Sequence, residues 1–166
     1  MGNKEFHTFR GYEIIKKNKE HLTPSMEDYL EMIYRNCQEE GYVRISKLAE
    51  KLNVKASSAS KTVSKLAEIG HLDYEKYGII RLTTKGEIMG AFLLDRHETV
   101  EAFLRHIGVL DTVLLETELI EHYLSIDTVK NIKILNEFLT NSPEVLEKLR
   151  HFKANYDDRN PPACGR

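Results

Sequence analysis

The stretch ETELIEHYLS, at residues 116–125, holds carboxylates and an imidazole at helical spacing. Glu118, Glu121 and His122 occupy positions i, i+3 and i+4, which are neighbours on the surface of a helix. Carboxylates and imidazoles together suit divalent transition metals such as Mn²⁺ and Fe²⁺. On its own, such a trio is more often an ordinary solvated face, so a metal site requires further ligands from elsewhere in the chain.

Two other segments contain residues that could complete such a site. The segment MEDYLE places Asp28 and Glu31 at i and i+3 of an expected helix, beside its apolar stripe. The segment LDRHETVE places His97 midway along a longer expected helix. Together the three segments offer enough carboxylates and imidazoles for two metal ions bridged by a glutamate. No histidine follows His97 four residues later, so the zinc-protease motif is absent.

Length and composition are those of an ordinary globular protein. The chain has 166 residues, 41% hydrophobic and 30% charged, which suits one compact unit or two small domains. No apolar run approaches the roughly 20 residues needed to cross a bilayer, and the N-terminus lacks the apolar core of a secretory signal. Cys37 and Cys164 form no CxxC pair. These features predict a cytoplasmic protein without a membrane partner.

The net charge of -2 conceals an asymmetry along the chain. Residues 42–85 contain nine lysines and arginines against four acidic residues, a net of +5. Residues 86–147 contain four against twelve, a net of -8. A basic half favours a polyanionic partner and an acidic half favours cations. Chance clustering of solvated charges is the alternative.

Local signals predict a helix-turn-helix in the basic half. A first helix begins with Thr23 as its cap and Pro24 at its first position. A short helix follows, with Ser46 as its cap and Asn53 as a left-handed stop. After a tight turn, a second helix rich in Ser, Thr and Lys covers residues 56–69. Two short helices joined by a tight turn are typical of DNA-binding proteins.

The segment after the helix-turn-helix predicts a β-hairpin. Leu72 and Tyr74 alternate in step with Ile80 and Leu82 across the turn EKYG. A hairpin directly after a recognition helix is a wing, so the basic half is predicted to be a winged helix-turn-helix.

The predicted recognition helix and wing carry hydroxyl and cationic side chains that suit DNA. Small hydroxyls and long cations can reach base edges and phosphates. A merely solvated face is the alternative for the helix, but the wing makes it less favourable. One module makes few phosphate contacts, so useful affinity for double-stranded DNA calls for a homodimer. The candidate DNA-binding residues are Ser57, Ser58, Ser60, Lys61, Ser64, Lys65, Lys76 and Arg81.

The acidic half is predicted to be helical. Thr84 caps a long helix that continues to about Ile107, with apolar residues at a period of 3.6. A further helix covers residues 111–124. These apolar helices are the candidate dimerisation surface.

Two more helices are expected toward the C-terminus. Ser125 or Asp127 caps the first of them. Ser142 begins a short helix that continues to about Phe152, and residues 157–166 resemble a disordered tail.

In this order, the segments LTPSMEDYLEMIY, YEKYGIIRLT, RHETVEAFLRHIGV and ELIEHYLS, with the helix-turn-helix between the first two, resemble the diphtheria toxin repressor family. Within that family they are most similar to the manganese transport regulator branch. The resemblance is nearly gap-free from Leu22 to Leu139. It implies a mainly α fold, in which an N-terminal winged helix-turn-helix is followed by a C-terminal helical dimerisation domain.

The resemblance divides the chain into four parts. An N-terminal extension covers residues 1–22 and matches no known role. The DNA-binding domain covers residues 23–84, and the metal-binding and dimerisation domain covers 85–142. A short helix and flexible tail occupy 143–166, too short for the SH3-like third domain of iron-sensing members.

The resemblance also implies a ligand set. Iron-sensing members carry Met and Cys at the positions of Asp28 and Glu118, whereas this chain has oxygen ligands at both. Oxygen ligands favour Mn²⁺ over softer metals, with Fe²⁺ as the alternative. Two ions per subunit are expected. The implied metal ligands are Asp28, Glu31, His97, Glu118, Glu121 and His122.

The implied function is metal-dependent repression of genes for metal uptake and homeostasis. Metal held between the two domains would order the dimer for a palindromic operator, with no small-molecule substrate and no enzymatic activity. Lys61 and Ser57 replace the Gln and Pro of iron-sensing members, so the operator sequence is expected to differ.

The sequence is also compatible with two alternatives. A carboxylate-bridged metalloenzyme could use the same six ligands, and it would be distinguished by turnover. A winged-helix regulator that binds another protein through its acidic face would contain no metal after gentle purification.

Overall fold

The computed structural model describes residues 22–75 and 78–159. The chain divides into two compact units at the bond between His97 and Glu98. Below, unit 1 denotes the described residues up to His97, and unit 2 denotes those from Glu98 onward. The predicted N-terminal extension, apart from Leu22, lies outside the described residues. Among the described residues, no helix is both long and apolar enough to span a bilayer.

Helix α2 (Pro24–Glu40) opens unit 1 as the sequence predicts. The Thr23 hydroxyl accepts a hydrogen bond from the Met26 N–H at 3.3 Å, which satisfies one of the unpaired donors at the helix start. Gly41, at φ 73°, ends the helix in the left-handed conformation that glycine adopts at little cost. Leu30 and Ile33 on its apolar face are fully buried.

The helix-turn-helix consists of α3 (Ile45–Lys51) and α4 (Ala56–Glu68). Asn53 has a φ of 52°, so the predicted left-handed stop is confirmed. The prediction that Ser46 caps α3 is wrong. Extended Arg44 takes the cap position without a side-chain bond, since the chain leaves a strand and enters the helix directly. Three residues of α4 that face inward are fully buried: Ala59, Val63 and Leu66.

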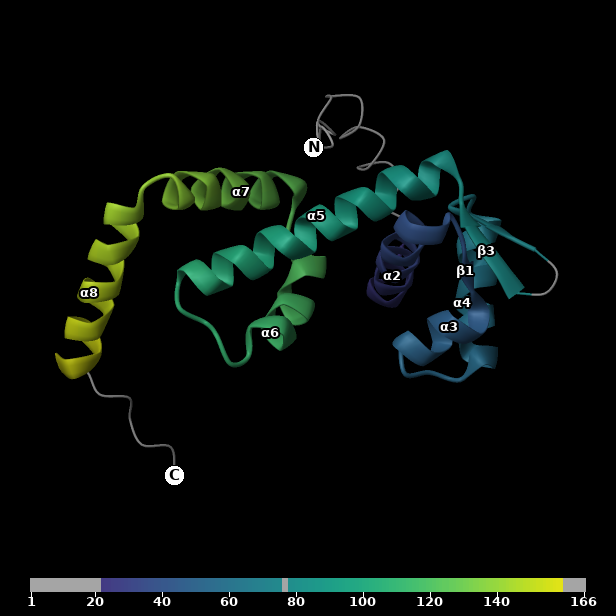
Figure 1. Cartoon of the computed structure of the whole chain (residues 1–166), viewed down its shortest axis with the longest axis horizontal. Helices are drawn as coiled ribbons and strands as arrows, with labels where there is room; N and C mark the ends of the chain where they lie inside the picture. The colour runs from purple at the N-terminus through teal and green to yellow at the C-terminus, as the bar shows by residue number, and fades with distance from the viewer. Residues whose placement is uncertain (1–21, 76–77, 160–166) are drawn as a thin grey trace. The chain divides into compact units, whose positions relative to one another are not determined.

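The wing is an antiparallel hairpin of β2 (Leu72–Tyr74) and β3 (Ile79–Leu82). Leu72 pairs with Leu82 and Tyr74 with Ile80, in the predicted register. A third strand, β1 (Val43–Arg44), pairs with the other edge of β3 and gives the order β1-β3-β2. Strands β1 and β3 are labelled in Figure 1. The sequence does not reveal β1, because two residues are too few to show an alternating pattern.

The long helix α5 (Thr84–His106) includes Thr84, the residue that the sequence predicts as its cap. The cap is therefore one residue earlier than predicted. Thr83, not Thr84, caps it, because the Gly86 N–H donates to the Thr83 hydroxyl at 3.1 Å. Gly86 itself lies against the main chain of His71, and an added Cβ would overlap the His71 carbonyl oxygen. The first turn of α5 is therefore in close contact with the main chain that directly precedes β2.

Unit 2 continues from α5 with α6 (Val113–Ile120) and the 3₁₀ turn η2 (Glu121–Tyr123). A single helix over residues 111–124 is therefore wrong. The apolar pattern continues past Ile120, but the backbone tightens into a 3₁₀ turn and is extended at Leu124. A small core forms where Val100 and Leu104 of α5 meet Val113.

Two helices complete unit 2. Ser125 caps α7 (Ile126–Thr140) by accepting the Thr128 N–H at 3.1 Å, which decides between the two predicted caps. Helix α8 (Pro143–Arg159) continues past the predicted end at Phe152, into part of the predicted tail. Lys-Ala-Asn-Tyr after Phe152 contains no helix breaker, and the next proline is Pro161.

Polar bonds tie the helices of unit 2 together. The Lys153 ammonium of α8 donates to the Ile107 carbonyl at 3.0 Å, beyond the end of α5. The Asn136 amide of α7 donates to the Thr99 carbonyl of α5 at 2.8 Å. Cations near a helix C-terminus favour its negative dipole end, so Lys153 stabilises α5 as well as linking α8 to it.

Candidate DNA interface and metal-binding residues

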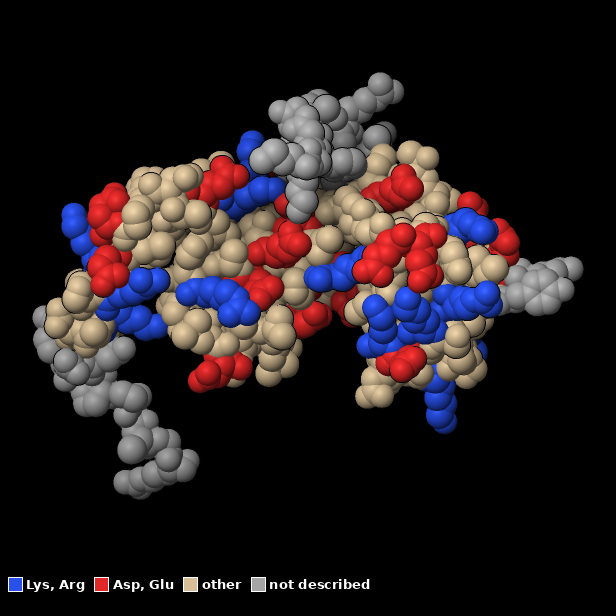
Figure 2. All heavy atoms as spheres, viewed as in Figure 1, with Lys and Arg blue, Asp and Glu red and all other residues tan. Residues whose placement is uncertain are grey.

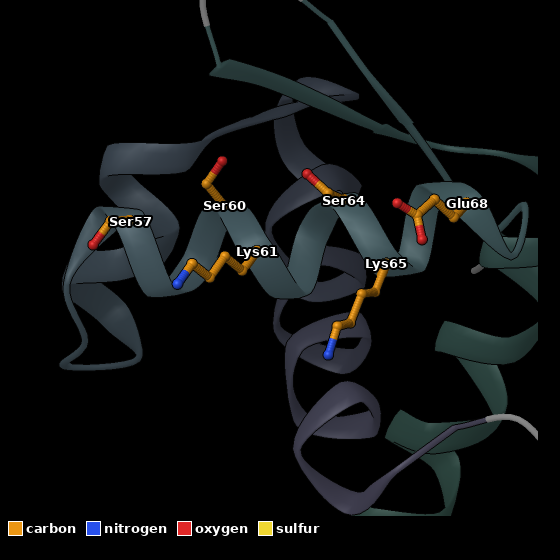
Figure 3. Close-up of a pocket in the computed structure, with 6 residues that line it drawn as sticks. All are labelled: Ser57, Ser60, Lys61, Ser64, Lys65 and Glu68. Atoms are coloured by element: carbon orange, nitrogen blue, oxygen red, sulfur yellow. The ribbon is translucent and has the colours of Figure 1, made fainter.

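The exposed face of α4 presents the predicted DNA-binding side chains. Ser57, Ser58, Lys61 and Lys65 are exposed. All of the predicted DNA-binding residues on α4 except Ser58 line a hollow along the helix. The Lys61 and Lys65 side chains extend from the same side of the helix (Figure 3). The hollow also includes Glu68, which the sequence does not single out. An acidic side chain at the end of a basic groove limits how far a phosphate backbone can follow it.

Ser60 is placed differently from the other hydroxyls of α4. Its oxygen lies 3.0 Å from the Tyr74 hydroxyl of β2, within hydrogen-bond distance. Both side chains are half-buried. The contact ties the recognition helix to the wing, so Ser60 has a positioning role that its residue type does not reveal.

The wing contributes Arg81, whose guanidinium forms an ion pair with Glu75 across the hairpin. Lys76 lies outside the described residues. In Figure 2 the Lys and Arg side chains gather over the helix-turn-helix, where α3 and α4 lie in Figure 1. The positive charge predicted for the basic half therefore gathers over the helix-turn-helix on the face shown in Figure 2.

In unit 1, three predicted metal ligands lie on two helices. Asp28 and Glu31 lie one turn apart on α2, and His97 lies on α5. Glu31 and His97 are both buried, and a carboxylate oxygen of one lies within 4.8 Å of a ring nitrogen of the other. The pair has a spacing that suits two ligands of a single ion.

A buried ion pair holds these two helices in register. The Arg96 guanidinium of α5 donates to the Glu27 carboxylate of α2 at 2.8 Å, and both side chains are almost completely buried. Glu27 precedes Glu31 by one helical turn, and Arg96 directly precedes His97. The sequence offers one signal for this pair: Arg96 lies on the apolar stripe of α5, between Leu93 and Val100.

The Glu31 carboxylate also accepts two hydrogen bonds from Arg35, one turn later on α2. The Arg35 Nε and Nη2 atoms lie 2.9 Å and 2.6 Å from the same oxygen, Oε1. Charge-assisted bonds of this length are strong in isolation. A predicted ligand is therefore already engaged by a cation of its own helix.

In unit 2, the three predicted ligands do not share one α-helical face. Glu118 lies exposed on α6, whereas Glu121 and His122 lie in the 3₁₀ turn η2. A carboxylate oxygen of Glu118 and a ring nitrogen of His122 lie within 4.8 Å of each other. Glu121 is only 1% exposed. The change of helix type thus separates an exposed carboxylate from a buried one.

Burial shifts the pKa of two other titratable side chains of unit 1, neither of which is among the predicted ligands. Burial, together with the negative charge of Glu87, raises the pKa of the Cys37 thiol to about 11, so it remains protonated at neutral pH. Burial, together with Lys85, lowers the pKa of His71 to about 4, so its ring remains neutral. His71 is fully buried between the end of α4 and the start of α5 and has a structural role.

The two halves of the chain match two models of one protein family. Residues 21–80 match the model described as iron dependent repressor, N-terminal DNA binding domain. Residues 83–150 match the iron dependent repressor metal binding and dimerisation domain. The two matched segments follow each other in the order that the motifs predict.

Curated relatives cover most of the chain. The HTH-type transcriptional regulator MntR of Lysinibacillus sphaericus is 43% identical over 136 residues, which are 81% of this chain and 98% of the relative. The protein of the same name from Geobacillus kaustophilus is 45% identical over 129 residues, covering 77% of this chain and 92% of the relative.

Solved structures agree with the fold. The manganese regulator SloR is 31% identical with a TM-score of 0.60, over 69% of this chain and 55% of that one. The metal-dependent transcriptional regulator MtsR is 30% identical with a TM-score of 0.63, over 70% and 55%. This chain therefore spans about half the length of these two solved chains. With both family models in order and relatives above 40% identity over most of its length, the chain belongs to the iron-dependent repressor family of metal-dependent transcriptional regulators.

Proposed function

We propose that this protein is a cytoplasmic, Mn²⁺-responsive repressor of metal-uptake and metal-homeostasis genes, with Fe²⁺ as the alternative activating ion. The observation that carries the proposal is the donor set. Each unit pairs a carboxylate with an imidazole at ligand spacing, Glu31 with His97 and Glu118 with His122. Asp28 and Glu118 supply oxygen, which suits Mn²⁺. The relatives named MntR and the solved manganese regulator SloR support the same metal.

The proposed ligands are three residues from each unit, serving two ions per subunit. A divalent ion bound by these residues would supply the positive charge that offsets the negative charges of their carboxylates. Without that charge, clustered carboxylates repel one another. Glu27 and Arg96 keep Glu31 and His97 at a fixed spacing, so part of the site is formed in advance. The proposed set is Asp28, Glu31, His97, Glu118, Glu121 and His122.

The exposed apolar residues of unit 2 fit a second copy of the chain. Leu114, Leu115, Leu119 and Tyr123 project from α6 and η2 with 59–83% of their surface exposed. Apolar area of this kind is normally covered in a protein–protein interface. A matched domain described as a dimerisation domain contains all four residues. We therefore assign them to the homodimer interface.

A homodimer of winged helices is suited to a palindromic operator. Two copies of α4 held about one helical turn of DNA apart can enter successive major grooves. The proposed contacting residues of α4 are then Ser57, Ser58, Ser60, Lys61, Ser64 and Lys65, and Ser60 also contacts Tyr74 of the wing. Arg81 and Lys76 would contact the backbone from the wing. Metal and operator would raise each other's affinity by the same factor, since the coupling is reciprocal.

The test is operator binding by the purified metal-free protein as Mn²⁺ is added. The DNA fragment comes from the protein's own genomic neighbourhood and contains the region that the protein protects in a footprint. Operator affinity should rise with Mn²⁺ and return to its starting value with a chelator. The double variant His97→Ala, Glu118→Ala should lose the Mn²⁺ response while its helix content is unchanged. Equal operator affinity with Mn²⁺ and with chelator would contradict the proposal.

The DNA contacts are tested separately. Lys65→Ala should weaken binding by about tenfold and lower the slope of log affinity against log salt by about 1, as expected when one phosphate contact is lost. Lys148→Ala, at an exposed lysine of α8, is the matched control and should change neither quantity. Equal effects of the two substitutions would remove α4 from the interface.

A further inference from the structure

Arg35 engages Glu31 in a way that bears on metal binding, and the inference rests on the proposed metal site. The two residues form an i, i+4 pair on α2. Both donating nitrogens of Arg35 lie on one oxygen, at 2.9 Å and 2.6 Å, rather than one on each oxygen. The guanidinium thus takes up Oε1 and makes no bond with Oε2.

The charge of Arg35 opposes a metal ion at the same carboxylate. A guanidinium is always protonated in proteins, so its positive charge is present at every accessible pH. A divalent cation bound to Glu31 would either displace Arg35 or remain close to it, and both outcomes cost free energy. Only 12% of the Glu31 side chain is exposed, which limits screening by water on that side of the pair.

The size of the effect is limited by the exposure of Arg35. Its side chain is 40% exposed, so solvent screens a good part of its charge. Complete suppression of metal binding is excluded on that ground. A moderate reduction in affinity is what a half-exposed cation can produce.

We propose that Arg35 is a built-in competitor for the metal, which weakens the binding of a divalent cation at Glu31 and so raises the metal concentration at which the protein responds. In the metal-free protein Arg35 bonds one oxygen of the Glu31 carboxylate. Glu31 therefore keeps a bonded partner and a defined orientation while the metal is scarce.

The chain contains a matched control for this pair. Arg105 and Glu101 form the same i, i+4 arrangement on α5, with the arginine Nε and Nη2 at 3.0 Å and 2.6 Å from a single glutamate oxygen. Glu101 is not among the proposed ligands. Arg105→Gln therefore removes the same charge and an equivalent pair of bonds, from a glutamate that is 25% rather than 12% exposed and is not a proposed ligand.

The experiment is a titration of the full-length metal-free protein with Mn²⁺, in which the free ion is measured by electron paramagnetic resonance. Arg35→Gln should bind the ion about fivefold more tightly than the wild type, whereas Arg105→Gln should agree with the wild type within about twofold. The difference between Arg35→Gln and the wild type should shrink at about 1 M salt, where charges are screened over a few ångströms. Helix content from circular dichroism should be unchanged in both variants.

A double-mutant cycle tests whether Arg35 acts through Glu31. Glu31→Gln alone should weaken Mn²⁺ binding. Adding Arg35→Gln to Glu31→Gln should then change the affinity by less than twofold, because the competing pair no longer exists. An undiminished fivefold gain in that background would mean that Arg35 acts through the general field, and it would overturn the proposal.

The outcomes separate this inference from the metal site itself. If the wild type binds no Mn²⁺, or if Glu31→Gln has no effect, the proposed site is wrong and the inference is overturned with it. If Glu31→Gln weakens binding but Arg35→Gln leaves it unchanged or weaker, the site stands and the inference alone is overturned. Weaker Mn²⁺ binding by Arg35→Gln would mean that Arg35 orients Glu31 for the metal instead of competing with the metal.

Discussion

The two units of the chain differ in how much of their apolar surface is exposed to solvent. Unit 1 buries its large hydrophobic residues, and Val54 is the one described there as exposed. Unit 2 leaves large hydrophobic residues exposed on α6, η2, α7 and α8, and its own core is small. A module that must lie on DNA needs a rigid, closed core, whereas a module that pairs with a second copy needs uncovered apolar area.

The ion pairs of the two units also differ in burial. Unit 1 contains a buried ion pair, Glu27 with Arg96, and a fully buried His71. The ion pairs described in unit 2, such as Glu101 with Arg105, are solvent-accessible. Loss of a buried charge partner costs far more than loss of an exposed one. The comparison therefore predicts that loss of the buried ion pair of unit 1 acts on stability, whereas substitution of the exposed apolar residues of unit 2 acts on association.

The largest effect is expected at Arg96. Arg96→Met removes the cation paired with the buried Glu27 and should lower the free energy of unfolding by about 3–5 kcal/mol. Arg105→Met, at the exposed pair of α5, should lower it by less than about 1 kcal/mol. Urea denaturation of the metal-free protein, followed by circular dichroism, measures both. Equal losses in the two variants would break the distinction between the units.

Acid should destabilise the protein through His71. Its pKa of about 4 in the folded chain lies below the ordinary value of 6.5, so the unfolded chain takes up the proton at a higher pH. Stability should therefore be complete above about pH 6.5 and fall by up to about 3 kcal/mol as the pH approaches 4. Carboxylates titrate in the same range, so the readout is the difference between wild type and His71→Leu. If both lose the same stability between these pH values, His71 is not responsible.

Association should respond to Leu119, which is 61% exposed on α6. Leu119→Asp should raise the dimer dissociation constant by about a hundredfold, because a charge is buried at the centre of an apolar interface. Val54→Asp places the same charge on the exposed hydrophobic residue of unit 1 and should leave the dimer intact. Analytical ultracentrifugation distinguishes the two variants. A monomeric Val54→Asp beside a dimeric Leu119→Asp would reverse the assignment of the interface.

The smallest effect is expected where the wing meets α4. Tyr74→Phe removes the hydroxyl that lies 3.0 Å from the Ser60 oxygen, and it should cost about 1 kcal/mol of stability. Operator affinity should fall a few-fold, since the wing loses its link to the recognition helix. Tyr123→Phe, at a residue of η2 that is 83% exposed, should leave stability unchanged. If Tyr74→Phe has the stability and the operator affinity of the wild type, the contact contributes neither to stability nor to DNA binding.

Local chemistry explains which elements could be predicted. The mainly α fold, the winged helix-turn-helix, the Thr23 cap, the Asn53 stop and the hairpin register are all confirmed. Each of these features is encoded in a few adjacent residues. The error at the cap of α5 arises because two neighbouring residues are equivalent by type. Thr83 and Thr84 are both good caps, and only the packed position of Gly86 decides between them.

Contacts between side chains that are far apart in the sequence are harder to predict. Arg96 and Glu27 are separated by 69 positions, and no local pattern pairs them. The Arg35–Glu31 pair was readable from its i, i+4 spacing, but its meaning depends on the role of Glu31. Ser60 has the same residue type as Ser57 and Ser64, and only its contact with Tyr74 sets it apart. The six ligands and the domain limits stay predictions from the sequence.

Gly86 has a consequence for mutational scanning. An added Cβ would overlap the His71 carbonyl oxygen, and the neighbouring backbone cannot give way as a flexible side chain would. Every substitution there should reduce repression in a reporter library, so its tolerance profile would resemble that of a ligand such as His97. The two positions would separate under excess Mn²⁺, which partly rescues a weakened site but not a displaced helix. A glycine that binds nothing can thus imitate a functional residue in genetic data.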